Sequence, residues 1–280
     1  MSESKQNKDS VKTKYHEHIV INENVGDYRT RWNLPDNWIS SLRHGDLFGM
    51  EYVGYISIIM DALRKHLPIS TDSGKSPLVF DIGCGDGRVS YEMATAGYRV
   101  SGFDYNQRAL GFARVYNPES TFKVADLTSE EVIPFHDGEE SPQAIVMVEV
   151  LEHIHPKHYP NVLGRLHSII APNGRFVISV PSKDLPLNEP WHYLHFSEED
   201  FQIVLEENGW NIEERIYNHR LAHPISWFMQ YGWRYIDNRL WRFHFLCGWF
   251  AKRYMRCCNI CKANQKPGRF IFVCKPSSQG

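Results

Sequence analysis

A short apolar run that opens into a glycine-rich loop is the feature that most narrowly limits how this chain can fold. Leu78 to Ile82 has the composition of a buried parallel strand, and Gly83, Gly85 and Gly87 follow it at alternate positions. A helix is expected to begin at Arg88. A glycine loop between a strand and a helix is the context in which this spacing indicates nucleotide binding rather than a generic turn. The loop therefore predicts an α/β domain with a ligand at the carboxyl end of its first strand.

Segments of strand type and helix type alternate after the loop. Strands are expected over residues 99–103, 122–125, 144–148, 175–180 and 210–216, and helices over 88–96, 107–116, 160–170 and 198–208. Such alternation produces right-handed crossovers, and it predicts a parallel sheet with helices on both faces. A last strand over 270–274 follows a long excursion rather than a short crossover, so it could enter antiparallel at the edge of the sheet.

Length and composition fit one large domain with additions better than two independent domains. The 280 residues are 42% hydrophobic, which is enough for a full core. We expect five segments, in chain order: a disordered tail (1–14), an N-terminal helical cap (15–70) with a helix that ends near His66, the core (71–218), a basic, aromatic and helical insertion (219–266), and the last core strand with a tail (267–280).

Cysteine content and apolar run lengths indicate the compartment. Six cysteines, with no charged and apolar leader at residues 1–14, are typical of a reducing environment. No run approaches the ~20 apolar residues that a membrane-spanning helix needs. We therefore expect a cytoplasmic protein, either free or peripheral on the inner face of the membrane.

The residues within and beside the loop favour a cationic ligand over a pyrophosphate. A dinucleotide-binding loop needs a small residue at its sixth position, counted from Gly83, and that position holds Arg88. Asp81, just inside the end of the strand, would repel a pyrophosphate and attract a cation. S-adenosylmethionine carries a sulfonium and an ammonium group and has no phosphate. The loop therefore suits this cofactor on electrostatic grounds.

Acidic residues also follow the second and third expected strands. Asp104 lies about 20 residues beyond the loop, where a carboxylate can accept hydrogen bonds from both ribose hydroxyls. Asp126, with the amide of Leu127, can read the adenine edge. Taken alone, an aspartate after a strand is more often a turn former than a ligand. Three such residues at consecutive strand ends, on one side of the sheet, favour a common ligand.

These three sites resemble motifs I, II and III of the class I S-adenosylmethionine-dependent methyltransferases, over roughly Leu78 to Trp210 and the strand at Phe270. The resemblance implies a Rossmann-like fold with a seven-stranded, mostly parallel sheet in the order 3-2-1-4-5-7-6, strand 7 antiparallel, and a helical insertion before that strand. It implies methyl transfer by in-line displacement at the sulfonium, which needs a positioned nucleophile more than covalent chemistry by the protein. The cofactor-binding residues that it implies are Asp81, Gly83, Cys84, Gly85, Gly87, Asp104, Tyr105, Asp126, Leu127 and Glu149.

A second informative site follows the fourth expected strand, where the sequence reads Glu-Val-Leu-Glu-His. If a helical turn begins there, Glu149, Glu152 and His153 project from one face and could chelate a divalent ion. A fourth ligand could come from His192 or His195, after the fifth strand. Oxygen and imidazole ligands with open positions suit magnesium, manganese, iron or zinc without selecting one.

This second pattern resembles two groups of metal-using enzymes, the ubiquinone-pathway O-methyltransferases and the enzymes that methylate the terminal ribose of small RNAs. Both act on vicinal oxygens, and a metal that bridges two adjacent hydroxyls lowers their pKa and directs one oxygen at the methyl group. The alternative is a site without metal, as in many class I enzymes where the acidic residue contacts the amino acid end of the cofactor. In that case His153, His192 or His195 is the candidate general base.

The expected insertion, residues 219–266, is strongly basic and aromatic. It holds four tryptophans and nine lysines or arginines against the single acid Asp237, a formal charge of +8 in a chain whose total is −2. Apolar residues recur at helical spacing from Phe243 to Tyr254, which predicts an amphipathic basic helix. Three interpretations remain open: packing on the domain or on a second subunit of a homodimer, attachment to an anionic membrane surface that presents a lipid-linked substrate, and, after these, binding of a nucleic-acid strand.

Cysteines near the end of the insertion raise the question of a zinc site. Cys257, Cys258 and Cys261, with Cys274 further on, contain one Cys-x-x-Cys spacing. A structural zinc site usually has two such pairs, so unliganded thiols are the competing interpretation.

The combined patterns predict an O-methyltransferase that acts on a hydroxyl of a sugar, polysaccharide or lipid-linked precursor, which is a small-molecule or glycan acceptor. Tyr28, Arg31 and Trp32 are expected to close the acceptor site together with the insertion. The alternative enzymes are a quinone-pathway or a ribose 2′-O-methyltransferase. An alternative from another class is a catalytically silent adenosylmethionine-binding scaffold, against which the intact set of acidic residues at the strand ends argues.

Overall fold

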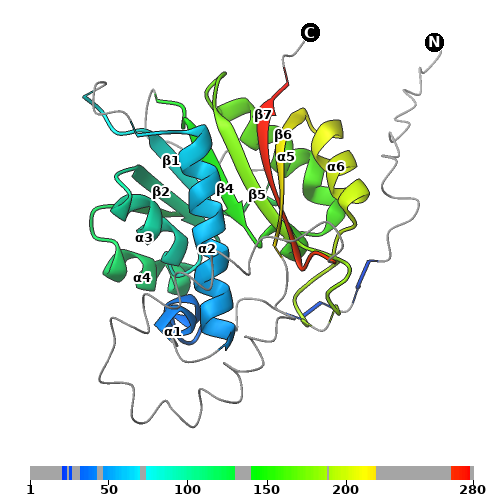
Figure 1. Cartoon of the computed structure of the whole chain (residues 1–280). Coiled ribbons are helices and arrows are strands. Elements are labelled where there is room, and N and C mark those ends of the chain that lie inside the picture. The colour runs from blue at the N-terminus through cyan, green and yellow to red at the C-terminus, as the bar shows by residue number, and fades with distance from the viewer. Residues whose placement is uncertain are drawn as a thin grey trace, which may run out of the picture.

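The described part of the chain forms one layered α/β unit (Figure 1). The computed structural model describes residues 21–23, 25–26, 32–42, 47–69, 74–129, 140–187, 189–218 and 266–277. The strands are β1 (Leu78–Ile82), β2 (Arg99–Asp104), β3 (Thr121–Val124), β4 (Ala144–Val148), β5 (Arg175–Pro181), β6 (Trp210–Asn218) and β7 (Arg269–Pro276). The helices are α1 (Asp36–Leu42), α2 (Leu47–His66), α3 (Arg88–Thr95), α4 (Gln107–Tyr116), α5 (Tyr159–Ile169) and α6 (Glu198–Glu207), with short 3₁₀ helices η3 (Leu151–His153) and η4 (Pro156–His158).

The strands pair into a single seven-stranded sheet in the order β3-β2-β1-β4-β5-β7-β6. Every pairing is parallel except the two made by β7, which runs antiparallel to β5 and to β6. The predicted Rossmann-like α/β fold and its strand order are therefore confirmed.

The long approach to the last strand left open an antiparallel position at the edge of the sheet. β7 is antiparallel, but it lies between β5 and β6, as in the strand order that the resemblance implies, and β6 is the edge strand. Phe270 to Cys274 are all buried, so β7 presents apolar side chains to both helical layers. A strand that is apolar on both faces is stable only where helices cover both sides of it, as in the interior of this sheet.

One face of the sheet is covered by α2 and α3, and α2 crosses in front of the central strands (Figure 1). Tyr55, Ile59 and Leu63 recur at helical spacing on α2 and are buried against strand residues such as Val146. The helix ends at His66, as expected, with Arg64, Lys65 and His66 in its last turn, where cations interact favourably with the helix dipole.

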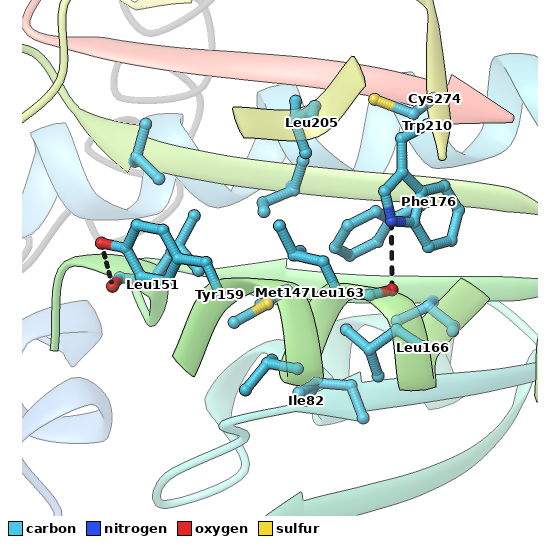
Figure 2. Close-up of a cluster of buried hydrophobic side chains, with 14 of the residues drawn as sticks. Ile82, Met147, Leu151, Tyr159, Leu163, Leu166, Phe176, Leu205, Trp210 and Cys274 are labelled. Atoms are coloured by element: carbon cyan, nitrogen blue, oxygen red, sulfur yellow. Dashed lines mark hydrogen bonds between the residues drawn. The ribbon is translucent and has the colours of Figure 1, made fainter. Parts of the chain in front are cut away.

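The opposite face is covered by α5 and α6, and it carries the larger apolar core (Figure 2). Trp210 is fully buried there against Phe176, at a ring-centroid distance of 4.5 Å, and its indole donates to the carbonyl oxygen of Leu163 at 3.3 Å. Tyr159 is buried at the other end of α5, and its hydroxyl donates to the carbonyl oxygen of Leu151 at 3.1 Å. This second bond ties α5 to the 3₁₀ helix η3, which holds part of the candidate site.

Several expectations concern residues outside the described ranges. The expected tail (1–14) and almost all of the expected insertion (219–266) lie there, as do Tyr28, Arg31 and the cysteines at 257, 258 and 261. Cys274, the fourth cysteine of the possible zinc site, is a buried free thiol within the core. Among the described residues, no helix is both long enough and apolar enough to cross a membrane.

Candidate functional site

The glycine loop after β1 has a backbone conformation that favours glycine, as two of its positions illustrate. Gly83 and Gly85 have φ angles of 70° and 53°, in the left-handed region that side chains other than glycine rarely adopt. A Cβ atom on Gly83 would lie 2.4 Å from Cγ2 of Val150, and one on Gly85 would lie 2.6 Å from Cη2 of Trp32. The carbonyl oxygen of Phe103 in β2 accepts from the amide of Gly83 at 2.7 Å. The loop is thereby fixed to the second strand.

Asp104, at the end of β2, acts directly on this loop. Its carboxylate accepts from the amides of Gly85 at 3.0 Å and Asn106 at 2.8 Å. The side chain of Asn106 in turn caps α4, since it accepts from the amide of Arg108 at 3.0 Å. Burial raises the pKa of Asp104 to about 6, and the two backbone amides oppose this rise. Asp104 therefore links the loop, β2 and α4 at the edge of one pocket.

Asp81 and Asp86 bracket the loop but serve its scaffold. Asp81 is buried and accepts from the Ser90 hydroxyl at 2.5 Å, and burial raises its pKa to about 7. Asp86 accepts from the amides of Asn37 at 2.9 Å and Trp38 at 3.3 Å, in the first turn of α1. Burial also raises the pKa of Asp86, to about 6. The carboxylate of Asp86 thus holds α1 against the loop.

The arginine at the sixth loop position packs sideways instead of crowding a ligand. The Arg88 side chain is largely buried and pairs with Glu92 one turn along α3, at 2.7 Å. Its guanidinium also lies 5.1 Å from the ring centre of Trp38 in α1. Arg88 therefore strengthens the contact between α1 and α3.

A cavity of about 560 Å³ opens at the carboxyl ends of the parallel strands, within the ~300–1,000 Å³ typical of ligand pockets. Six of the residues predicted to bind the cofactor line it: Gly83, Asp104, Tyr105, Asp126, Leu127 and Glu149. The other four do not line it: Asp81 lies in β1, and Cys84, Gly85 and Gly87 lie in the loop that follows. The Cys84 side chain points into a core cluster with Leu110 and Phe122, and burial raises the pKa of its thiol well above the ordinary value.

Several residues that line the cavity are not among the predicted site residues. His155, Lys157 and His158, in and beside η4, line the cavity. Trp191 and Tyr193 line it from the segment after β5. The first three follow the Glu-Val-Leu-Glu-His pattern by two to five residues, and the other two lie in the histidine-rich segment. This closeness to predicted site residues was the indication that the sequence offered.

The N-terminal segment closes one wall of the cavity. The amide of Asn22 donates to the carbonyl oxygen of Tyr193, and the amide of Gly26 donates to that of Pro190, both at 2.8 Å. Trp32 is buried against the glycine loop and lines the same cavity. Of the three N-terminal residues expected to close the acceptor site, Trp32 is the one inside the described ranges, and it lies at the pocket.

Glu149 does not join Glu152 and His153 on one helical face, so the expected helical turn is wrong. Its φ angle is 53°, and the 3₁₀ helix η3 begins only at Leu151. The Glu149 carboxylate accepts from the Tyr55 hydroxyl at 3.1 Å and pairs with Arg269 at 3.0 Å. These two partners, from α2 and β7, hold the Glu149 carboxylate in place.

Glu152, His153 and His192 do come together, each offering one potential ligand atom within 4.8 Å of the others. Glu152 is fully buried, and the rings of His153 and His192 are 4.5 Å apart. His153 Nδ1 lies 3.0 Å from the carbonyl oxygen of Trp191. This three-residue group, which we call the carboxylate–imidazole cluster, is a donor set that suits a divalent ion.

His195 stands behind this cluster rather than in it. Its Nε2 lies 2.8 Å from Nδ1 of His192, and its Nδ1 lies 3.0 Å from the carbonyl oxygen of Leu185. Burial lowers the pKa of His195 below the ordinary value for histidine. Of the five residues proposed as metal ligands, the structure thus groups three and places Glu149 and His195 outside.

The chain is similar to known proteins over this same region. The family described as a methyltransferase domain matches residues 57–236, more than half of the chain. A ubiquinone biosynthesis O-methyltransferase from Aromatoleum aromaticum is 33% identical over 108 residues, which are 38% of this chain and 44% of that protein. A probable S-adenosylmethionine-dependent methyltransferase from Mycolicibacterium smegmatis is 25% identical over 145 residues, 49% of this chain and 53% of that protein. The chain spans about half the length of the curated relatives that it matches.

Solved structures share the fold. A magnesium protoporphyrin IX methyltransferase from Synechocystis with bound SAH has a TM-score of 0.54 and 18% identity, covering 89% of this chain and 97% of that one. A 1,6-didemethyltoxoflavin N1-methyltransferase from Burkholderia thailandensis, with its substrate and S-adenosylhomocysteine bound, has a TM-score of 0.52 and 18% identity, covering 87% of each chain. At this level of identity, these similarities establish the fold alone.

Proposed function

We propose that this chain, which belongs to the methyltransferase domain family, transfers the methyl group of S-adenosylmethionine to a hydroxyl oxygen that has a second oxygen beside it. The bond from the acceptor oxygen to the methyl carbon forms as the bond from that carbon to the sulfonium breaks. S-adenosylhomocysteine leaves as a neutral thioether, and the hydroxyl proton passes to a base or to water. Such a displacement depends on holding the two reactants in line.

The strand ends beside the glycine loop suit the cofactor. Asp104 and Asp126 give this end of the pocket acidic walls, which favour the sulfonium and ammonium charges of S-adenosylmethionine. The Asp104 carboxylate is fixed by two backbone amides, so it is oriented before a ribose hydroxyl arrives. Leu127 and Tyr105 offer apolar surface for the adenine ring.

One observation carries the assignment to an oxygen acceptor: the carboxylate–imidazole cluster adjoins this same pocket, which His153 lines. Glu152, His153 and His192 would hold a divalent ion, and such an ion supplies Lewis acidity that lowers the pKa of two adjacent hydroxyls. Two imidazoles in a set of three favour manganese, iron or zinc over magnesium, which prefers oxygen ligands.

Two acceptor types present adjacent oxygens in this way. The relatives named ubiquinone biosynthesis O-methyltransferases support a catechol-type ring first. Trp191 and Tyr193 in the pocket wall favour a flat aromatic acceptor, because aromatic rings stack on one another. A sugar diol of a polysaccharide or a lipid-linked precursor is the second candidate.

An acceptor panel tests this proposal. Purified protein is incubated with S-adenosylmethionine and a catechol, a matched phenol with one hydroxyl, a sugar diol, or a set of nitrogen and carbon acceptors. S-adenosylhomocysteine formation is measured for each. We expect turnover with the catechol, or with the sugar diol, and much slower turnover with the phenol. Methylation only of nitrogen or carbon acceptors would overturn the proposal.

A further inference from the structure

A chain of two hydrogen bonds runs from a backbone carbonyl, through His195, to the cluster residue His192. It begins at the carbonyl oxygen of Leu185, 3.0 Å from His195 Nδ1, and continues from His195 Nε2 to His192 Nδ1 over 2.8 Å. We propose that His195 is a positioning residue that fixes His192 with its hydrogen on Nδ1 and its lone pair on Nε2. This inference deepens the proposed function, because it concerns a residue of the same site.

The direction of the chain follows from what each atom can do. A carbonyl oxygen only accepts, so Nδ1 of His195 must carry the hydrogen of that bond. A neutral imidazole has one hydrogen, which leaves His195 Nε2 as an acceptor. His192 Nδ1 must then donate, and the lone pair of His192 is left on Nε2. The Leu185 carbonyl oxygen therefore determines the tautomer of His192 through the His195 ring.

His153 has the same arrangement with one link fewer. Its Nδ1 lies 3.0 Å from the carbonyl oxygen of Trp191, so Nδ1 donates and the lone pair is on Nε2. Both imidazoles of the cluster thus offer Nε2, the nitrogen on the far side of each ring from its carbonyl or histidine partner. A neutral nitrogen lone pair is what a metal ion requires of histidine.

The segment that carries these rings is held by its backbone. The amide of Leu185 donates to the carbonyl oxygen of Ser182 at 2.9 Å, which closes a turn and fixes the terminal acceptor of the chain. The amide of Tyr193 donates to the carbonyl oxygen of Glu152 at 2.8 Å, and the Asn22 side chain donates to that of His192 at 3.2 Å. The two rings therefore sit on an anchored segment.

A histidine in this place differs from a carboxylate in its effect on charge. Ligand histidines often donate to a carboxylate, which adds negative charge behind the metal and raises the basicity of the imidazole. Here the partner is a neutral ring that ends on a neutral carbonyl. Glu152 stays the only anion of the cluster, so an ion bound there keeps more of its positive charge for the acceptor oxygens.

The tautomers can be read directly in the metal-free full-length protein. Histidine labelled with ¹⁵N is observed by long-range ¹H–¹⁵N correlation, and the His192 and His195 signals are assigned from their loss in the single His→Gln variants. We expect both rings to carry their hydrogen on Nδ1. A His192 ring with its hydrogen on Nε2 in the wild-type protein would overturn the inference.

Two variants at the same position separate positioning from packing. His195→Gln keeps one acceptor for His192 and one donor for Leu185, whereas His195→Leu keeps neither. We expect Mn²⁺ affinity, measured by titration calorimetry, to fall about 10–100-fold in His195→Leu and to stay near wild type in His195→Gln. His66→Gln, which loses the 2.6 Å contact to Glu214 at the distant end of α2, is the control and should bind Mn²⁺ as the wild type does.

The outcomes distinguish this inference from the proposed function. If wild-type protein binds no Mn²⁺, the metal step of the proposed function fails, and the tautomer spectrum still decides the role of His195. If wild-type protein binds Mn²⁺ and His195→Leu binds it equally well, the positioning role is wrong while the metal site stands. Melting temperature and S-adenosylmethionine affinity report whether each variant is folded.

Discussion

Single residues at the strand ends hold the loop as well as facing the pocket. Asp104 shows this double role, because its carboxylate fixes the Gly85 amide while its side chain lines the cavity. Gly85 in turn lies against Trp32, which closes the pocket from the N-terminal side. The Trp32 ring therefore packs directly against the loop, because Gly85 has only a hydrogen atom where other residues carry a Cβ.

Gly85→Ala tests that contact. The new methyl group would lie 2.6 Å from the Trp32 ring, and the backbone would keep a φ angle of 53° that costs alanine of order 1–3 kcal/mol. We expect a lower melting temperature and S-adenosylmethionine binding weakened at least tenfold, measured by calorimetry. Gly164→Ala is the control, because a Cβ there meets nothing within 4 Å. Equal affinities in the two variants would contradict the close packing of the loop.

The buried aspartates predict a pH dependence with a definite sign. Burial raises the pKa of Asp104 to about 6, above the ordinary value of 3.8. The folded state therefore binds this proton more tightly than the unfolded state. Its stabilising contribution is fully present below pH about 3.8 and is lost as the pH rises through about 6.

Comparison of wild type with Asp104→Asn isolates this effect from other titrating groups. Between pH 4.5 and 7.5, the free energy of unfolding of wild type should fall relative to that of the variant, by no more than about 3 kcal/mol. Chemical denaturation at a series of pH values measures the difference. Parallel curves for the two proteins would show that the Asp104 carboxyl titrates normally.

The helices and strands that carry the site could largely be predicted from the sequence, and the turns between them could not. The strand at 144–148 and the helix at 107–116 follow directly from apolar periodicity, and the structure confirms both. After β4, the helical turn was expected to include Glu149, but the 3₁₀ helix begins only at Leu151. Glu149 is directed by Tyr55 and Arg269, residues 94 and 120 positions away, and no local pattern can reveal such partners.

Within the site, too, the residues at strand ends could be predicted and the arrangement within the connecting segments could not. Asp104 and Asp126 follow predicted strands, so the parallel sheet brings them to one edge, as expected. His195 also lies near the cluster, but its separation from the ligand group depends on a 2.8 Å contact between two rings three residues apart. Spacing alone could not decide which of the two histidines faces Glu152.

The contact between α1 and the glycine loop depends on the Asp86 carboxylate, which a substitution can remove. Asp86→Ala removes the carboxylate that accepts from the amides of Asn37 and Trp38, a contact equivalent to a helix cap worth about 1 kcal/mol. We expect these two amides to exchange their hydrogens faster, as followed by NMR, and α1 to be cut more readily by protease. Asp61→Ala, at an exposed position on α2, is the control. Unchanged exchange in Asp86→Ala would mean that other contacts hold α1.

For the molecule as a whole, the sheet gathers distant segments around one pocket. The chain near Gly26, the loop after β1, the 3₁₀ helices after β4 and the segment after β5 all contribute lining residues. The cofactor end lies at β1 to β3, and the carboxylate–imidazole cluster lies beyond β4. Under the proposed function, the cofactor would bind at the first of these ends and an acceptor oxygen would be activated near the second, where His153 lines the cavity.

The most direct test of this account measures methyl transfer before and after metal removal, in wild type and in Glu152→Gln. The variant removes the single anion of the cluster with little change of shape, and S-adenosylmethionine affinity is measured alongside to show that the cofactor end is intact. We predict that chelation abolishes S-adenosylhomocysteine formation in wild type, that Mn²⁺ or Zn²⁺ restores it, and that Glu152→Gln binds the cofactor but stays inactive with either ion. Full activity in chelated wild-type protein that holds far less than one ion per chain would contradict the account.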